Sequence, residues 1–258
     1  MRVVNLDAKF LTDRGQIRTH NEDAGGVFYN QSKQLLAIIA DGMGGHQAGD
    51  IASQLTVSLI QEKWEKESHL ITPDETEKWL TETIAHINGV IYEQSREHED
   101  FTSMGTTVVT AIVTDEFVTI AHIGDSRCYI YNESGFTQVT EDHSLVNELM
   151  RSGQISKADA QNHPRKNIVL KALGTEKEEW ADVQTMSWDI NNKLLLCSDG
   201  LTDKMSDEEL ANLIAQDKSI KSIGQQMINV ANERGGEDNI SLVIVQNSFV
   251  SEGGDDSC

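Results

Sequence analysis

Four aspartates stand where apolar, strand-like runs of this 258-residue chain begin or end. Asp41 follows the run LLAIIA, and Asp125 follows FVTIAHIG. Asp199 follows KLLLCS, and Asp238 stands shortly before ISLVIV. One aspartate beside a glycine at a strand end is ordinary turn chemistry. The repetition favours a shared site, provided that the strands are neighbours in one sandwich and open at the same end.

An arginine and two more acids lie near the N-terminus, in the segment RTHNED. Arg18 precedes Glu22, which is followed directly by Asp23. If these acids converged with the four aspartates, any two carboxylates about 4 Å apart would repel by about 4 kcal/mol at an effective dielectric constant of about 20. Such a site needs protons or cations, and ligands that offer only oxygen select hard divalent ions such as Mg²⁺ or Mn²⁺.

The glycine-rich loop after Asp41 differs from the phosphate-binding loops of nucleotide sites. Its sequence, GMGGHQAGD, lacks the lysine and the hydroxyl residue of a P-loop and the G-x-G-x-x-G spacing of a dinucleotide site. The G-x-S-x-G motif of serine hydrolases does not occur in the chain. Glycines at 42, 44 and 45 would instead leave backbone carbonyls and water unobstructed by side chains.

Composition limits the classes of function. The net charge of −21 argues against binding of long polyanions such as nucleic acid. No apolar run reaches the roughly 18 residues of a membrane span, and the N-terminus lacks the apolar core of a signal peptide. Cys128, Cys197 and Cys258 are too scattered for a disulfide framework or a zinc site. We therefore expect a soluble, cytoplasmic monomer that binds neither nucleic acid nor membrane.

The elements that must position the acids can be read from hydrophobic patterns. β-Branched apolar runs predict strands at 35–40, 106–113, 117–124, 128–131, 193–198 and 240–245. Helix signals are an apolar stripe over 50–64, a cap at Thr72 before Pro73, a capping box at Ser206–Glu209 and a stop at Gly235. Strands and helices do not alternate regularly, which favours an α+β fold with antiparallel sheets. We expect one domain over 1–247 and a disordered tail over 248–258.

Six motifs occur in order between residues 18 and 241: RTHNED, ADGMGGH, SMGTT, IGDSR, SDGLTD and GGEDNIS. Together they resemble the motif set of the PPM family, the metal-dependent type 2C serine/threonine protein phosphatases. The segments EDHSLVNELMRSGQIS and HPRKNIVLKALG resemble the flap of bacterial-type members. The resemblance implies a four-layer α-β-β-α sandwich of two antiparallel sheets flanked by helices, with a flap subdomain at about 143–173.

The resemblance also implies two tightly bound Mn²⁺ or Mg²⁺ ions. Asp41 would bridge the two ions, and the backbone carbonyl of Gly42 would ligate one of them. Asp199 and Asp238 would ligate the other ion. Asp125, together with Asp199, would help to hold a third, weaker ion.

The remaining motif residues would act on water and phosphate. Glu22 and Asp23 correspond to acids that hydrogen-bond or contact metal-bound water, and Arg18 corresponds to the arginine that binds the substrate phosphate. Animal members carry a histidine directly after the Asp-Gly pair, as a proposed general acid, where this chain has Met43. His46 lies nearby but matches a different position, so a metal-bound water is the alternative proton donor.

The function implied is metal-dependent hydrolysis of phosphoserine and phosphothreonine in proteins, by attack of metal-activated water and without a phosphoenzyme intermediate. Its partners would be phosphoproteins, and it would reverse a bacterial serine/threonine kinase. One alternative is a non-catalytic metal- or partner-binding module of the same fold; another is a different metallohydrolase, such as a phosphodiesterase. We interpret His20, His122, His143 and His163 as structural, because no carboxylate-rich spacing surrounds them.

The flap leaves two interpretations open. Its segment HPRKN places Arg165 and Lys166 near an acidic site, after a short helix that is expected from Ser144 to Arg151. The flap is either a solvated loop or a mobile element that contacts the phosphoprotein and gates product release.

Overall fold

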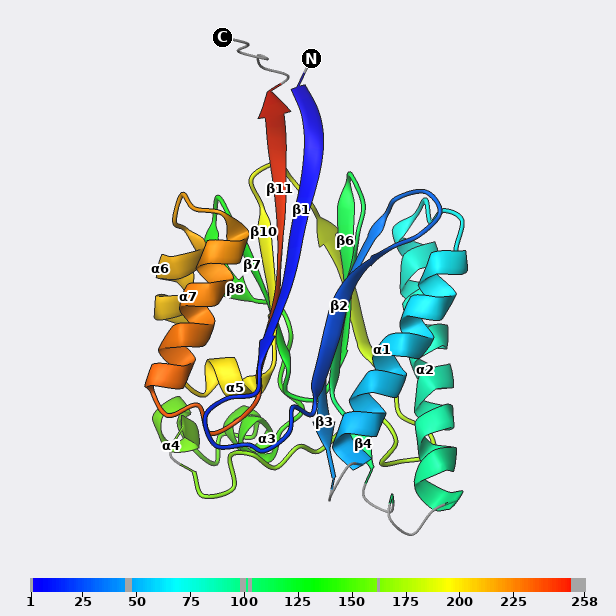
Figure 1. Cartoon of the computed structure of the whole chain (residues 1–258). Helices are drawn as coiled ribbons and strands as arrows, with labels where there is room; N and C mark the ends of the chain where they lie inside the picture. Colours follow the sequence, from blue (N-terminus) through cyan, green and yellow to red (C-terminus); the bar gives the residue numbers. More distant parts are fainter. Residues whose placement is uncertain (1, 45–47, 98–100, 102–103, 162, 252–258) are drawn as a thin grey trace.

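Two antiparallel β-sheets lie face to face at the centre of the molecule, and helices cover the outer face of each (Figure 1). The computed structural model describes residues 2–44, 48–97, 101, 104–161 and 163–251. The α+β fold and the four-layer α-β-β-α sandwich expected from the sequence are confirmed.

Each sheet is assembled from strands that are far apart in the chain. The first sheet has the order β1 (Arg2–Asp13), β11 (Ile240–Ser251), β10 (Lys193–Cys197), β7 (Arg127–Asn132) and β8 (Gly135–Gln138). The second has the order β2 (Asp23–Tyr29), β3 (Leu35–Met43), β5 (Val108–Val113), β6 (Phe117–Ile123) and β9 (Asp182–Ser187), with the short β4 (Gly105–Thr106) also paired to β3.

Helices cover both sheets. The second sheet carries α1 (Ala48–Lys66) and α2 (Pro73–Glu97), and the first carries α6 (Asp207–Ile214) and α7 (Ile220–Glu233). Three shorter helices, α3 (Leu145–Arg151), α4 (Lys157–Gln161) and α5 (Asp199–Thr202), lie at the end of the sandwich opposite the chain termini (Figure 1). No helix among the described residues is long and apolar enough to cross a membrane.

Alternation along the central strands explains the layers. In β3, Leu35, Ala37 and Ile39 belong to the core between the sheets. The alternate residues Leu36 and Ile38 pack in the core beneath α1 and α2. Since successive side chains of a strand point to opposite faces, a strand that is covered on both faces appears in the sequence as an unbroken apolar run.

Helix starts follow the capping signals of the sequence. The capping box at Ser206 is present, with the Ser206 hydroxyl accepting from the backbone N–H of Glu209 and the Glu209 side chain accepting from that of Ser206. Thr72 and Glu75 make the same reciprocal contacts before α2. The helix expected from Ser144 to Arg151 is also found, with Ser144 as its N-cap. These local signals were therefore sufficient to place the starts of α2, α3 and α6.

The two ends of the chain are paired. β1 and β11 run antiparallel, from Arg2 opposite Ser251 to Asp13 opposite Ile240. The strand thus includes residues 248–251, which were expected in the tail, because β1 extends as a pairing partner over them. Residues 252–258 lie outside the described part of the chain.

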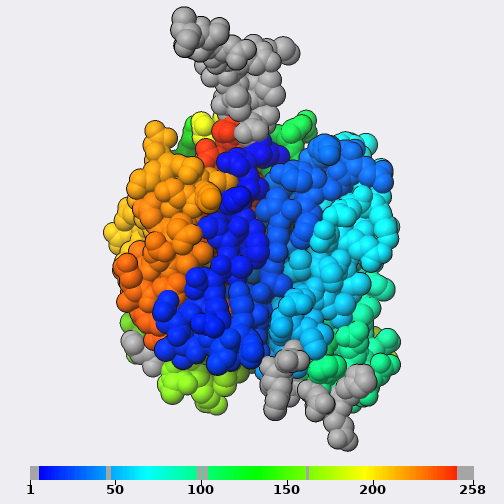
Figure 2. Space-filling view, in the orientation of Figure 1, coloured from blue at the N-terminus to red at the C-terminus, as the bar shows by residue number. Residues whose placement is uncertain are grey.

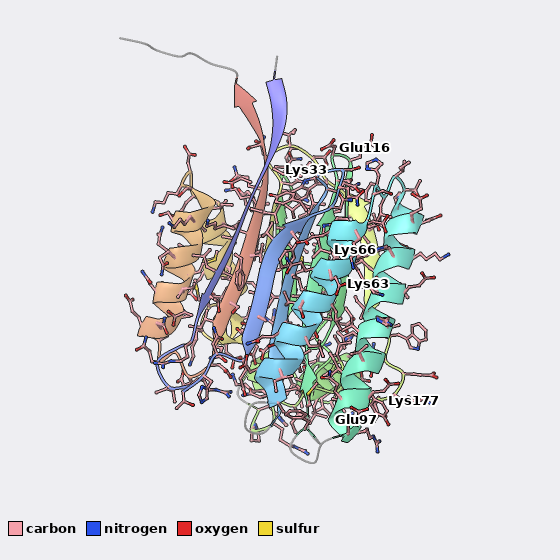
Figure 3. All side chains as sticks on the ribbon, turned by 45° about the vertical axis from the view of Figure 1, so that its right-hand side comes forward. Lys33, Lys63, Lys66, Glu97, Glu116 and Lys177 are labelled. Carbon is pink, nitrogen blue, oxygen red and sulfur yellow. The ribbon has the colours of Figure 1, made fainter. Side chains whose placement is uncertain are left out.

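A space-filling view shows one face of the molecule (Figure 2). The N-terminal segment lies between α7 and α1 on one face of the molecule (Figure 2). On α1, Lys66 is exposed and Lys63 is partly exposed (Figure 3), whereas Trp64 between them is fully buried. The helix therefore separates a charged outer side from an apolar inner side.

Candidate active site

The predicted acids meet at the end of the sandwich opposite the termini. Asp23 and Asp41 are direct partners in the β2–β3 pairing. Asp199 is the first residue of α5 and is separated from β10 by Ser198 alone, and Asp238 stands just before β11, the strand that pairs with β10. Asp125 follows β6 by one intervening glycine. Five aspartates from both sheets therefore reach one region.

A cavity of about 230 Å³ joins these residues. Of the sequence-predicted residues, Arg18, Glu22, Asp41, Gly42, Asp125, Asp199 and Asp238 line it, together with Met43. Asp23 is not part of the lining; it is buried and is the registered partner of Asp41. His46 and Gly45 lie outside the described residues.

Gly42 is required by the close approach of α1. A Cβ atom added at this position would lie 2.1 Å from the carbonyl oxygen of Gly49, in the first turn of the helix. The backbone N–H of Gly42 donates to the carbonyl of Glu22 at 3.1 Å, and the Ser53 hydroxyl donates to the same carbonyl at 2.6 Å. This glycine therefore lets α1 and the loop of Glu22 pack against the end of β3.

The Ser198 side chain links the two sheets near the acidic cavity. The Ser198 hydroxyl donates to Asp23 Oδ2 at 2.8 Å and accepts from the backbone N–H of Ser241 at 3.0 Å. Ser198 directly precedes Asp199, so this contact sets how far the carboxylate pair Asp23–Asp41 lies from Asp199.

Asn239 holds the loop that carries Arg18 and Glu22. Its Oδ1 accepts from the Glu22 N–H at 2.7 Å, and its Nδ2 donates to the carbonyls of Arg14 at 2.8 Å and His20 at 3.0 Å. Asn239 was not among the residues predicted from the sequence; its position directly after Asp238 was the available signal.

Arg18 lies at the mouth of the cavity. Its Nη2 is 2.7 Å from Asp238 Oδ2, and its Nη1 is 3.6 Å from Glu22 Oε2. The arginine side chain is about half-exposed (46 %), so part of the guanidinium faces solvent. A planar guanidinium in this position can bind two oxygens of an incoming phosphate.

The buried carboxylates raise one another's pKa. Burial, followed by the charge of Asp23, holds the pKa of Asp41 well above its usual range, and burial with the charge of Asp125 does the same for Asp199. Burial raises the pKa of Asp23 to about 6, although the nearby hydroxyls of Ser241 and Ser198 act to lower it. Burial and the charge of Asp142 raise the pKa of Asp125 to about 6. When they are ionised, the carboxylates of the site thus carry more negative charge than the neighbouring positive groups neutralise.

These residues fit hard divalent cations. The donors are carboxylate and carbonyl oxygens, which are the ligands that Mg²⁺ and Mn²⁺ prefer. Asp23 Oδ1 is buried and has no hydrogen-bond partner among the described residues, although a buried carboxylate oxygen normally has one. Water bound to a cation would satisfy this oxygen, so both the charge and the unpaired atom favour ions in the cavity.

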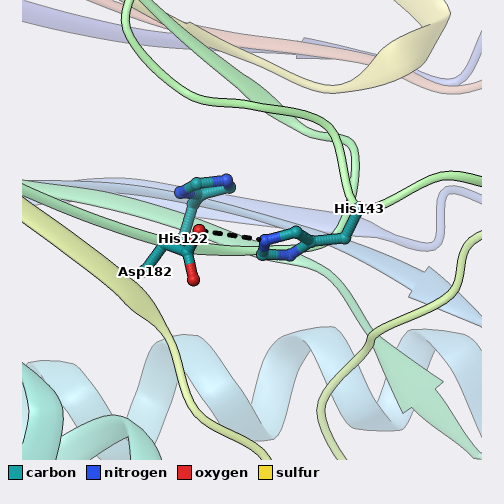
Figure 4. A group of neighbouring side chains, drawn as sticks. All are labelled: His122, His143 and Asp182. Carbon is teal, nitrogen blue, oxygen red and sulfur yellow. Dashed lines mark ion pairs between the residues drawn. The ribbon is translucent and has the colours of Figure 1, made fainter. Parts of the chain in front are cut away.

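A second group of possible ligands lies outside this cavity. One ligand atom from each of His122, His143 and Asp182 lies within 4.8 Å of the others (Figure 4). Both histidines are predicted to be structural from the sequence, and Asp182 is not among the predicted ligands because it comes from β9, far along the chain. In the β6–β9 pairing, His122 and Asp182 are direct partners.

The predicted flap borders a larger cavity of about 860 Å³, which shares Asp125 and Asp199 with the acidic site. Two ion pairs cross it. Lys166 Nζ lies 2.6 Å from Asp203 Oδ2, and Lys157 Nζ lies 3.8 Å from Asp207 Oδ2. Lys166 thus contacts the segment that directly follows α5, whereas its neighbour Arg165 is exposed.

Comparison with known proteins agrees with this arrangement. A family profile described as Protein phosphatase 2C matches residues 15–243. The chain belongs to the protein phosphatase 2C family. The serine/threonine phosphatase stp of Listeria innocua is 45 % identical over 252 residues, which cover 98 % of this chain and 100 % of that protein.

Solved structures of the family share the whole fold. Serine/threonine phosphatase Stp1 from Staphylococcus aureus has a TM-score of 0.88 at 40 % identity, and the match covers 96 % of each chain. The catalytic domain of PstP, solved in complex with two manganese ions, has a TM-score of 0.83 at 28 % identity, and the match covers 95 % of this chain and all of that one.

Proposed function

We propose that this chain hydrolyses phosphoserine and phosphothreonine in proteins, in a reaction that depends on Mn²⁺ or Mg²⁺. The observation that carries the proposal is the convergence of Asp41, Asp199 and Asp238 on one cavity, with Arg18 at its mouth. The relatives support it, because those with 45 % identity and nearly complete coverage are named serine/threonine phosphatases.

The residues divide into groups by what they would hold. We assign two tight ions to Asp41, the Gly42 carbonyl, Asp199 and Asp238, and a third, weaker ion to Asp125 together with Asp199. The two manganese ions of PstP support the first assignment. Bound ions would neutralise these carboxylates and lower the pKa of water toward neutrality, which supplies a nucleophile.

Glu22 and Asp23 would orient water rather than bind ions directly. Asp23 is buried, and its free oxygen Oδ1 can accept a proton or a hydrogen bond from water. Arg18 would bind the phosphate oxygens, exchanging its contact with Asp238 for the substrate once that carboxylate is neutralised. Substrate binding and ion binding are therefore coupled through Asp238.

The reaction would proceed without a phosphoenzyme. Burial raises the pKa of the Cys197 thiol to about 12, so this cysteine is a poor nucleophile at neutral pH. Met43 lines the cavity at the position where animal members have histidine, and a thioether carries no proton to donate. We therefore assign protonation of the leaving alkoxide to water.

We further propose a cytoplasmic monomer whose phosphoprotein substrates are produced by a serine/threonine kinase. Cys128 and Cys197 are buried free thiols, in keeping with a reducing compartment. The flap, with Lys166 and Lys157 beside the larger cavity, would contact the protein part of the substrate.

Metal reconstitution tests the proposal. The protein is stripped with a chelator, Mn²⁺ is restored, and phosphate release is measured from a phosphothreonine peptide and from p-nitrophenyl phosphate. The bis(p-nitrophenyl) ester serves as the phosphodiester control. We expect Mn²⁺-dependent release from both monoesters and much slower reaction of the diester. Binding of Mn²⁺ without hydrolysis would favour the non-catalytic module, and a preference for the diester would favour a phosphodiesterase.

A further inference from the structure

His143 binds both backbone groups of Gly124. The backbone N–H of Gly124 donates to the ring atom Nδ1 of His143 at 3.1 Å. In return, the backbone N–H of His143 donates to the Gly124 carbonyl at 2.9 Å. Gly124 has a φ of +107°, and a Cβ atom there would lie 2.6 Å from the side chain of Thr107. This backbone conformation, which directly precedes Asp125, is therefore held in place from the outside by one histidine.

The same histidine closes the base of the flap. The Leu170 N–H donates to the His143 carbonyl at 2.7 Å, and the Leu145 N–H donates to the Ile168 carbonyl at 2.9 Å. Ser144 and Val169 form an isolated bridge between these contacts. The two ends of the flap thus meet through backbone contacts at residues 143–145 and 168–170, and the residue at one end of this junction is the histidine whose ring binds Gly124.

The imidazole ring of His143 is itself braced. It stacks on the ring of His122, with centroids 4.7 Å apart and planes inclined by 12°. Its Nε2 lies 3.4 Å from Asp182 Oδ2, and Figure 4 marks this contact with a dashed line. His122 Nε2 lies 2.9 Å from the Glu141 carbonyl. The His143 side chain is 11 % exposed. The ring therefore has little room to rotate away from Gly124.

The contacts favour a hydrogen-bonded brace over a metal site at these histidines. Because His143 Nδ1 accepts from Gly124, the ring proton of the neutral form lies on Nε2, which faces Asp182. The rings of His122 and His143 are nearly parallel, and the lone pair of an imidazole nitrogen lies in the plane of its ring. The two lone pairs therefore lie in different planes and are poorly placed to bind the same ion.

We propose that His143 is a positioning residue that couples the flap to Asp125. The inference rests on the proposed function, in which Asp125 helps to hold the weaker ion. Loss of the hydrogen bond to Gly124 would let the segment 124–125 relax and would loosen the flap at Leu170. The affinity for the weaker ion and the order of the flap base would then change together.

Three substitutions of His143 distinguish the contact of Nδ1 with Gly124 from the contact of Nε2 with Asp182. His143→Asn keeps an acceptor close to the position of Nδ1, so it can still bind the Gly124 N–H. His143→Gln places its amide nearer the position of Nε2, toward Asp182, and His143→Ala removes both contacts. Asp182→Asn is the matched control, since it changes the outer contact and leaves Gly124 untouched.

Mn²⁺ binding is measured by electron paramagnetic resonance of the free ion, which counts bound ions without reference to activity. We expect His143→Ala and His143→Gln to weaken the weakest Mn²⁺ site by roughly 10- to 100-fold, the range for loss of a group that supports a ligand. His143→Asn and Asp182→Asn should stay within about threefold of the unmodified chain. Hydrogen exchange at Gly124 and Leu170, measured without metal, should accelerate in the same two weakened variants.

The proposal is wrong if His143→Asn loses as much Mn²⁺ affinity as His143→Gln. It is also wrong if His143→Ala has the Mn²⁺ affinity and the amide hydrogen exchange of the unmodified chain. Should His143→Ala fail to fold, the comparison of Asn with Gln decides by itself. Absence of Mn²⁺-dependent phosphate release from the unmodified protein would instead contradict the proposed function. The two failures are thereby distinguished.

Discussion

The Ser198 hydroxyl donates a hydrogen bond of 2.8 Å to Asp23 Oδ2 across the interface between the two sheets. Ser198 follows β10 of one sheet and directly precedes Asp199, whereas Asp23 begins β2 of the other and faces Asp41. The short side chain of Ser198 thus sets the distance between the acids that would surround the two proposed metal ions.

Replacement of this serine should loosen the metal site. We expect Ser198→Ala to reduce Mn²⁺ affinity by roughly 10- to 100-fold and the free energy of unfolding by about 1–3 kcal/mol, because Asp23 Oδ2 loses a buried donor. Titration calorimetry and urea unfolding measure the two effects. Ser134→Ala, at an exposed serine, is the control and should change neither.

Loss of a proposed ligand should have a larger effect. Asp199→Asn is isosteric, so it should remove ion binding and turnover while the fold is kept. We expect Mn²⁺ affinity to fall by more than roughly 100-fold, beyond the range for supporting residues. Circular dichroism checks the fold, and Asp115→Asn, an exposed acid-to-amide change, is the control. Near-normal activity of Asp199→Asn in the presence of Mn²⁺ would rule out the proposed ligand set.

Arg18 should act on binding more than on turnover. Arg18→Ala removes a contact to phosphate that exists in both ground and transition states, so KM for p-nitrophenyl phosphate should rise with a smaller change in kcat. A charge-assisted hydrogen bond of about 1.5–3 kcal/mol corresponds to roughly 10- to 100-fold in KM. Arg14→Ala, an exposed arginine in the same loop, should leave KM unchanged. A loss confined to kcat would contradict this role.

The metal-free protein should lose stability as the pH rises. Unfolded aspartates titrate near pH 3.9, whereas Asp23 and Asp125 have pKa values of about 6 in the folded chain, because burial disfavours their charged forms. Between these values the folded state retains protons that the unfolded state has released. The contribution of each group to the free energy of unfolding is therefore present at low pH and lost as the pH rises through about 6.

Thermal melting with a chelator, between pH 4.5 and 7.5, measures this effect. Asp23→Asn removes one of the groups, so its melting temperature should rise relative to the unmodified chain as the pH increases. Added Mn²⁺ should reduce the loss of stability in the unmodified chain, because cations replace the protons. Equal pH dependence of both proteins would show that Asp23 titrates normally.

Local sequence patterns were sufficient for the elements that are buried on both faces or capped by their own side chains. The continuous apolar runs of β3 and β10 predicted strands, and Ser206 with Glu209 predicted the start of α6. The motifs also named the acids that line the cavity. These features depend on residues that are close together in the chain.

Other features depended on contacts between distant segments. β1 and β2 were not among the predicted strands, because as edge strands they are covered less completely and their apolar pattern is weaker. Nothing local links Ser198 to Asp23, Asn239 to Glu22, or His143 to Asp182. The sequence by itself determined which carboxylates stand at strand ends; whether they meet was decided by the packing of the two sheets, because that packing alone sets the distances between residues that are remote in the chain.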